Sequence, residues 1–316
     1  MTAAAATLES SDVRYVRPPA ESHVINEDLM RRPIEIHLVG LGGTGSQLLT
    51  NLARMHLSMI AEGHPGGLTV GVYDPDRVTP SNVARQLFYK ADIGRYKADV
   101  LVNRVNLAYG TVWDAHPVRY EVIAEQYAVK GISPCDVLIT AVDTAKARRD
   151  IAAITAAHPP LYWLDTGNSE RTGQVILSEP CGHLYALAAA QLRPESLSPV
   201  TLGKPGALGC ACNRCLNDTL GYVRSLPLPQ LHEVEALKEI FDPSYVDDES
   251  EPSCSLADAL RSQDLFVNQQ CASWASHLLR TLFRTGRLDV HGVWINLEDC
   301  RVAPVPVPKY GVGSNG

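Results

Sequence analysis

A glycine-rich loop between a β-rich run and a helical pattern most restricts how this chain can fold. The run Ile34–Gly40 reads IEIHLVG, the loop GLGGTGS starts at Gly40, and apolar residues then recur at helical spacing through SQLLTNLARMHLSMIA. This order opens a Rossmann-like unit, in which glycines let a phosphate approach the backbone and the next helix offers free N–H groups. The candidate phosphate-binding residues are Gly40, Gly42, Gly43, Gly45 and Ser46. NAD, FAD and ATP sites all use such a loop, and a tight turn without a ligand is the alternative.

Strand and helix patterns alternate through the first half of the chain. Further strands are predicted at residues 68–74, 118–123, 135–143, 161–167 and 173–179, and helices at 97–109 and 144–157. This alternation predicts an α/β fold, with a mostly parallel sheet covered by helices on both faces. A long helical stretch at 256–284, a last strand at 290–299 and an extended proline-rich tail are expected to complete it.

Composition divides the chain into four parts. Residues 1–30 are expected to form a polar arm, residues 31–180 a Rossmann-like half with the candidate nucleotide site, and residues 181–253 a crossover or insertion. Residues 254–316 supply a C-terminal helix, strand and tail of the same domain. The segment 181–253 breaks the strand–helix rhythm with CACNRC, LPLPQ and YVDDESEP, which favours an excursion over the sheet.

Charge and hydropathy narrow the class of protein. The formal net charge is −7 and the sequence pI is about 5.8, whereas nucleic-acid surfaces carry a basic stripe. No apolar run reaches the roughly 18 residues that indicate a membrane span. The segment MTAAAATLESSD lacks the charged start and apolar core of a secretory signal. We therefore expect a cytoplasmic protein that binds neither nucleic acid nor membrane.

A polar string follows the predicted second strand. It runs DPDRVTPSNVARQ from Asp74, whose carboxylate at the end of the strand can accept hydrogen bonds from ribose hydroxyls. Splitting ATP between its α- and β-phosphates requires cations and donors around the triphosphate. Arg85 suits this role because its planar fork binds phosphate at two points, and Lys97 can add a point charge. Solvated surface charge is the alternative for either residue alone.

A second acidic residue is expected at the same edge of the sheet. Asp143 follows the buried run CDVLITAV, and the carboxyl ends of parallel strands meet at the ligand crevice. Mg²⁺ prefers oxygen ligands that it shares with phosphates. Asp143 is therefore a candidate Mg²⁺ ligand; it can also act as the N-cap of the helix that starts with TAKARRD.

Four segments, taken in order, resemble the E1-like family of ThiF, MoeB and the ubiquitin activators. They are VGLGGTGS, YDPDRVTPSNVARQ, IGRYK and LITAVDT. Their order and spacing are similar to the family pattern of GxGGxGS, DxDxVxxSNxxRQ, GxxK and an aspartate after the fourth strand. The similarity is strong over residues 34–180 and weaker over 254–300. The segments ADIG, WLDTGN, EPSCSLADAL, QDLFVNQ and HGVWINL look closest to the ThiF-like proteins of the PRTRC plasmid cassette.

The resemblance implies an adenylation site that uses ATP and Mg²⁺. In such a site Asp74 would hold the ribose, and Asn82, Arg85 and Lys97 would contact the phosphates. Gln86 would support the turn, and Asp76 is a further candidate cofactor-binding residue. Arg85, Lys97 and the Mg²⁺ held by Asp143 would act in catalysis by neutralising charge on the departing pyrophosphate. The implied substrate is the C-terminal glycine carboxylate of a small ubiquitin-like partner, and a homodimer is also implied.

The cysteines add two hypotheses. Many members of the family hold a structural Zn²⁺ with two CxxC pairs, and here Zn²⁺ would need Cys210, Cys212, Cys215 and Cys254. Because the CxC spacing is unusual for zinc, ordinary reduced thiols are the alternative. Other members transfer the adenylated carboxylate to a thiol, for which Cys254 is the candidate, since a helix start lowers thiol pKa, and Cys181 is the second. Cys271 lies in the helical stretch and is expected in the core.

Two other functions explain part of the pattern. An NAD(P)-dependent dehydrogenase would account for the glycine loop and Asp74 but not for SNVARQ or Asp143. A non-catalytic E1-like scaffold subunit would account for the fold, although such a subunit tends to lose the residues that this chain keeps at positions 85, 97 and 143.

Overall fold

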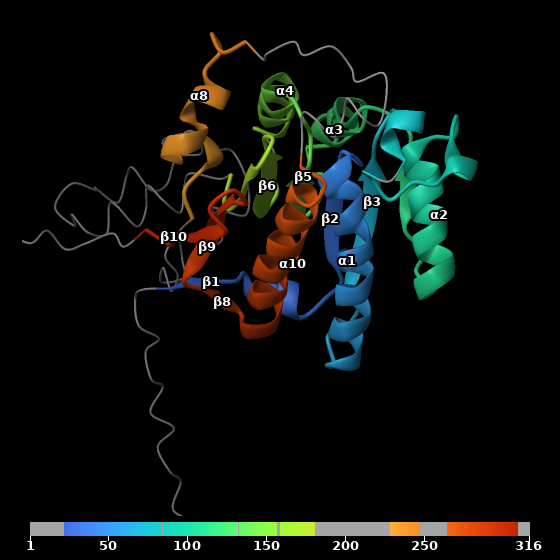
Figure 1. Cartoon of the computed structure of the whole chain (residues 1–316). Helices are drawn as coiled ribbons and strands as arrows, with labels where there is room; N and C mark the ends of the chain where they lie inside the picture. The colour runs from blue at the N-terminus through green and yellow to red at the C-terminus, as the bar shows by residue number, and fades with distance from the viewer. Residues whose placement is uncertain are drawn as a thin grey trace, which may run out of the picture.

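One large mixed sheet organises the structure (Figure 1). The computed structural model describes residues 22–180 except 84, 132, 157 and 158, together with residues 228–246 and 264–308. Within these residues the sheet has eight strands in the order β10-β9-β7-β6-β5-β2-β3-β4. The strands are β2 (Ile34–Val39), β3 (Leu68–Tyr73), β4 (Asp114–His116), β5 (Val137–Thr140), β6 (Tyr162–Asn168), β7 (Thr172–Ser178), β9 (Val290–Asn296) and β10 (Arg301–Pro306).

The sheet has a parallel half and an antiparallel half. Strands β4, β3, β2, β5 and β6 run parallel, with Leu38 opposite both Val72 and Ile139. Strands β7, β9 and β10 continue the sheet from β6 in antiparallel order. A separate antiparallel pair joins β1 (His23–Val24) to β8 (Arg287–Leu288). The predicted fold class, a Rossmann-like α/β fold with a mostly parallel sheet, is confirmed.

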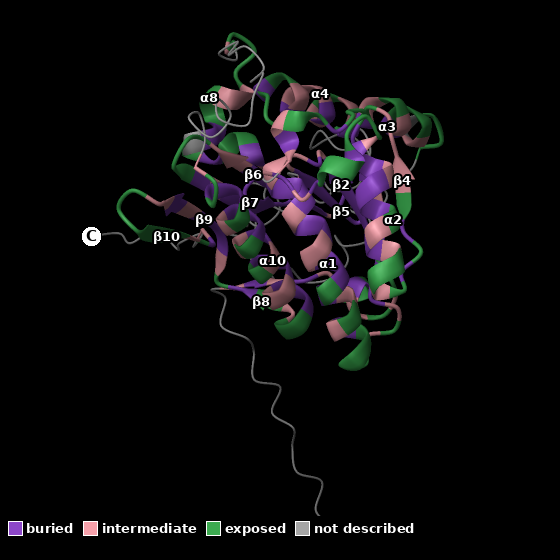
Figure 2. Cartoon of the chain, turned by 45° about the vertical axis from the view of Figure 1, so that its right-hand side comes forward, coloured by how far each residue is buried: buried purple, intermediate pink, exposed green. Residues whose placement is uncertain are grey.

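Helices cover both faces of the sheet (Figure 2). One face carries α1 (Gly43–Ala61), α2 (Lys97–Tyr109) and α10 (Val267–Thr285), which share one hydrophobic cluster with the strands. The other face carries α3 (Tyr120–Val129), α4 (Ala145–Thr155) and the segment around α8 (Lys238–Phe241), which form a second cluster. Among the described residues, no helix is both long and apolar enough to cross a bilayer.

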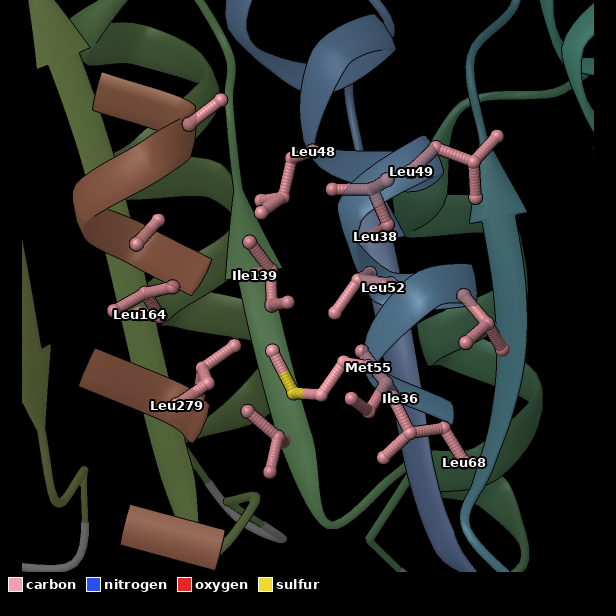
Figure 3. Close-up of a cluster of buried hydrophobic side chains, with 14 of the residues drawn as sticks. Ile36, Leu38, Leu48, Leu49, Leu52, Met55, Leu68, Ile139, Leu164 and Leu279 are labelled. Carbon is pink, nitrogen blue, oxygen red and sulfur yellow. The ribbon is translucent and has the colours of Figure 1, made fainter. Parts of the chain in front are cut away.

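Apolar side chains fill the space between the sheet and the pair α1 and α10 (Figure 3). Leu48 and Leu52 of α1 and Leu279 of α10 are completely buried. They face Leu38, Ile139 and Leu164 of the central strands. Burying a leucine side chain stabilises a fold by about 1.5–3 kcal/mol, so these contacts hold both helices against the sheet.

The predicted strand at 118–123 is wrong. The chain forms strand β4 earlier and then begins α3 at Tyr120. Tyr120 and Ala124 are buried, whereas Val122 is half exposed and Val129 is almost fully exposed. Burial four residues apart is the period of a helix, and the short segment alone did not reveal it.

Both ends of the described chain take a larger part in the folded structure than the sequence predicts. Within residues 23–30, which were assigned to the arm, Ile25 and Leu29 are buried against the core. At the other end, the strand at 290–299 is not the last one, because the proline-rich tail forms β10 beside it. Its prolines, Pro304 and Pro306, are tolerated because β10 lies at the edge of the described sheet.

Candidate nucleotide-binding site

The candidate site lies where the strand order reverses. From β2 the chain crosses by α1 to β3 on one side, and from β5 it crosses by α4 to β6 on the other. Open α/β sheets bind ligands at this switch point, outside the carboxyl ends of the strands. Gly40 follows β2 and Asp143 follows β5, so the structure brings both predicted residues to this place.

The glycine loop is too tightly packed for larger residues. Gly40 has φ of +91°, and a Cβ atom there would lie 2.7 Å from the Ala141 carbonyl oxygen. A Cβ on Gly45 would lie 1.9 Å from the Gly40 carbonyl oxygen. At Gly42, by contrast, no atom lies within 4 Å of the Cβ position. The loop is thus compact toward the protein and open at Gly42, which fits a phosphate beside the start of α1.

Asn268, at the start of α10, is a site residue that sequence reasoning missed. Its Oδ1 accepts a hydrogen bond from Thr44 Oγ1 at 3.0 Å, and a Cβ on Gly43 would lie 2.3 Å from its Cγ. Asn268 is only 3% exposed. A polar residue on the buried face of an amphipathic helix was the available signal.

Asp74 braces the loop from the neighbouring strand. Its Oδ2 accepts a hydrogen bond from Leu41 N at 2.6 Å and its Oδ1 accepts one from Asp76 N at 2.9 Å. Burial raises the pKa of Asp74, while the Lys97 ammonium and the two backbone donors act in the opposite direction. The carboxylate therefore fixes the loop, and its contact with a ribose stays a prediction.

Lys97 and Asp76 form an ion pair beside this loop. Lys97 Nζ lies 2.9 Å from Asp76 Oδ2. The side chain of Lys97 is 8% exposed, whereas that of Asp76 is 64% exposed. Backbone bonding also joins the two residues, since Lys97 N donates to the Asp76 carbonyl. The structure therefore places the predicted cation at the start of α2 with a solvent-accessible carboxylate against it.

The SNVARQ turn is held against the glycine loop. Asn82 Oδ1 accepts a hydrogen bond from Thr79 N, and Gln86 N donates to the Asn82 carbonyl. Leu87 N donates to Ser46 Oγ at 3.3 Å, which joins the turn to the first helix. Gln86 is buried, and its Oε1 accepts no hydrogen bond from the described residues. This orphaned oxygen is available to a donor on a ligand or on an ordered water.

Arg85 lies within electrostatic reach of Asp143. Burial lowers the pKa of Arg85, and the nearby Asp143 carboxylate partly offsets this by raising it. Arg85 is half-buried and Asp143 is exposed. Asp143 does not cap α4, as one interpretation of the sequence held; Thr144 does, by accepting a hydrogen bond from Ala147 N at 3.2 Å. The Asp143 carboxylate is thus exposed and is not used as a helix cap, and oxygen is the donor that Mg²⁺ prefers.

Most of the cysteines in the zinc and thioester hypotheses lie outside the described residues. The candidate zinc ligands Cys210, Cys212, Cys215 and Cys254 all lie outside the described residues, as does Cys181. In the part of the chain that is described, no group of three or more metal-binding side chains gathers. Cys271 is buried in the core as predicted, and burial raises its pKa to about 12, which disfavours the nucleophilic thiolate.

Several solved structures are similar to this chain. The structure of E. coli MccB with succinimide is 13% identical with a TM-score of 0.49, covering 89% of this chain and 66% of that chain. A selenomethionine structure of PaaA is 13% identical with a TM-score of 0.49, covering 87% and 64%. The E. coli tRNA N6-threonylcarbamoyladenosine dehydratase, TcdA, is 23% identical with a TM-score of 0.34, covering 43% of this chain and 53% of that chain. This chain thus spans between about half and two thirds of the length of those chains.

Sequence comparison gives the family. No curated protein matches the chain. The model of the ThiF family matches residues 27–263, which contain the glycine loop, the polar string and Asp143. This match supports E1-like adenylation chemistry in general terms and leaves the substrate open. The match covers most of the sequence, and the chain belongs to the ThiF family.

Proposed function

We propose that this protein uses Mg·ATP to adenylate the C-terminal glycine carboxylate of a small ubiquitin-like protein. A carboxylate oxygen attacks the α-phosphorus, the bond between this phosphorus and the oxygen bridging to the β-phosphate breaks, and pyrophosphate leaves. The observation that carries the proposal is the convergence at the switch point of the glycine loop, Arg85 and Asp143.

Each group has a defined part in the proposed reaction. The loop at Gly42 and the start of α1 receive phosphate oxygens. Arg85 and Lys97 neutralise the charge that builds up on the departing pyrophosphate. Asp143 would hold Mg²⁺, which would supply further charge neutralisation at the phosphates. Because the carboxylate and ATP are held together, placement also contributes to the rate.

Ligand-induced stabilisation separates adenylation from dehydrogenation. ATP with Mg²⁺ is expected to raise the melting temperature of the protein, and NADH is not. Stabilisation by NADH alone would instead favour the NAD(P)-dependent dehydrogenase.

An adduct assay tests the reaction itself. The protein is incubated with ATP, Mg²⁺ and a candidate ubiquitin-like protein, and mass spectrometry is used to detect AMP on the terminal glycine of that protein. Arg85→Gln should reduce adduct formation by about 100-fold, the usual loss when a charge-stabilising group is removed. The matched control is Arg54→Gln, an exposed arginine on α1, which should leave the adduct unchanged. Nucleotide binding without any adduct or pyrophosphate exchange would favour a non-catalytic scaffold.

Three further predictions stand beside this proposal. Homodimerisation, a structural Zn²⁺ and transfer to the Cys254 thiol concern chain copies or residues that the structure does not describe. Native mass spectrometry of the full chain measures both its oligomeric state and any bound Zn²⁺. Transfer to Cys254 is tested by comparing hydroxylamine-sensitive adducts on the parent chain with those on Cys254→Ser.

A further inference from the structure

Arg148, on the first turns of α4, is a buried cation that the site described above does not use. The residue is 4% exposed. Its fork donates in three directions: Nε to Asp165 Oδ1 at 2.9 Å, Nη2 to the Thr166 carbonyl at 2.9 Å and Nη1 to the Thr144 carbonyl at 3.3 Å. These acceptors belong to the end of β6 and the start of α4, so one side chain ties the two elements together.

The carboxylate that Arg148 meets is fully buried. Asp165 is 0% exposed, and its Oδ1 also accepts a hydrogen bond from Thr140 Oγ1 at 2.6 Å. Its Oδ2 has no hydrogen-bond partner among the described residues. A buried carboxylate is costly unless a cation compensates it, so Asp165 keeps the guanidinium of Arg148 in place. The ends of β5 and β6 are further joined by Thr166 Oγ1, which donates to the Thr140 carbonyl.

Only one peptide bond separates this network from Asp143. Arg148 holds the carbonyl of Thr144, and the Thr144 hydroxyl caps α4 through Ala147 N. The Asp143 side chain itself is exposed, and it is Thr144 rather than Asp143 that caps the helix. The position of Asp143 depends on its backbone as well as on the nearby Arg85, and Arg148 binds this backbone through the adjacent Thr144 carbonyl.

We infer that Arg148 is a positioning residue, which holds the 141–144 turn so that the Asp143 carboxylate meets the Mg²⁺ of the bound nucleotide. The inference rests on the proposed function. Residues that orient a metal ligand from behind typically change metal affinity by about 10- to 100-fold when they are altered. The geometry thus predicts that altering Arg148 changes how ATP binding depends on Mg²⁺, while the affinity for ATP without Mg²⁺ stays nearly the same.

The substitution Arg148→Lys separates the effect of the positive charge from the effect of the hydrogen-bond geometry. Arg148→Lys keeps a cation near Asp165, but a single ammonium cannot reach three diverging acceptors as the planar fork does. ATP binding is measured by calorimetry on the full chain, first without Mg²⁺ and then over a series of Mg²⁺ concentrations. Arg148→Lys should raise the half-saturating Mg²⁺ concentration by about tenfold, while Mg²⁺-free ATP affinity should stay within about twofold of the parent.

The matched control is the next residue on the same helix. Arg149 also donates to two backbone carbonyls, those of Ile240 at 2.8 Å and Tyr245 at 3.2 Å, but both lie in the segment around α8. Arg149→Lys should leave the Mg²⁺ dependence unchanged. If Arg148→Lys fails to fold, the double variant Arg148→Gln with Asp165→Asn removes both buried charges together and should fold with a similar Mg²⁺ shift.

The outcomes distinguish this inference from the proposed function. If the parent chain binds Mg·ATP and Arg148→Lys or the double variant has the parent's Mg²⁺ dependence, the inference is wrong and the proposed function stands. If Mg²⁺-free ATP affinity falls as much as Mg²⁺ affinity, Arg148 acts on the fold of the whole site and the inference is again wrong. If the parent chain binds no nucleotide with Mg²⁺, the proposed function fails and the inference fails with it.

Discussion

At the scale of single residues, the glycine loop shows how absent side chains shape the site. The backbone turns back so closely that the Gly40 carbonyl oxygen occupies the place of a Cβ on Gly45. Gly42, two residues beyond Gly40, has open space instead. The same residue type is therefore required for packing at one position and for access at the other.

This difference gives a first prediction. Gly45→Ala should lower the free energy of unfolding by about 3 kcal/mol, because overpacked atoms force the backbone to shift. Gly42→Ala is the matched control and should cost less than about 1 kcal/mol, the usual effect of exchanging these two residues without a clash. Urea unfolding of both variants provides the measurement, and equal losses would contradict the packing argument.

A second prediction concerns pH and His291 on β9. The side chain is 1% exposed, and Nδ1 donates to the Leu177 carbonyl at 2.8 Å. Burial lowers the pKa of His291 below its unfolded value, although the Leu177 hydrogen bond partly opposes the shift. Its contribution to stability is therefore fully present above the unfolded pKa and is lost as the pH falls through the folded pKa.

Unfolding experiments between about pH 7 and about pH 5 check the sign. The parent protein should lose stability as the pH falls, and His291→Gln should lose less. His277→Gln, which alters an exposed histidine on α10, should follow the parent. A parent protein that gains stability toward pH 5 would refute the role of His291.

At the scale of elements, α10 supports the start of α1. The two helices lie side by side in the same direction, since Asn268 meets the first turn of α1 and Arg280 donates to Ser58 near its end (Figure 1). Their N-termini therefore lie at the same edge of the sheet, where the positive ends of both dipoles favour an anion. A C-terminal helix thus takes part in forming a loop that precedes it by more than 200 residues.

Removing this support gives a third prediction. Asn268→Ala leaves the buried Thr44 hydroxyl without its acceptor and opens a small cavity, which should cost about 2 kcal/mol of stability. ATP affinity should fall as well, because the glycine loop loses its backing. Gln269→Ala, an exposed neighbour on α10, should change neither quantity. Thermal unfolding and calorimetry measure the two effects, and parent-like behaviour of Asn268→Ala would rule out a supporting role.

At the scale of the whole molecule, the chain completes its sheet from segments far apart in sequence. Strand β9 adds to β7 after the 181–263 region, and α10 covers the apolar face that α1 alone leaves open. The Rossmann-like half therefore depends on the C-terminal segment for part of its core (Figure 3).

A fourth prediction follows for truncated chains. A chain ended after residue 263 loses α10, β9 and β10, and it should show no cooperative thermal transition, because buried leucines of α1 become exposed to water. A chain ended after residue 308 keeps every described element and should unfold like the parent. Cooperative unfolding of the shorter chain, followed by circular dichroism, would show that residues 22–180 form an independent core.

The sequence by itself determined most of the strands and helices between residues 34 and 180, the glycine loop and the placement of Asp74 and Asp143 after strands. These features depend on local periodicity and on the residue types that a turn requires, so residues close together in the sequence are enough to predict them. Only the tertiary structure decided that α3 begins at Tyr120, that Asn268 packs on Gly43 and that Arg148 holds the turn beside Asp143. Those features depend on contacts between segments that are distant in the sequence. The free energy of such contacts comes from burying apolar side chains and pairing polar ones, which a local sequence pattern does not predict.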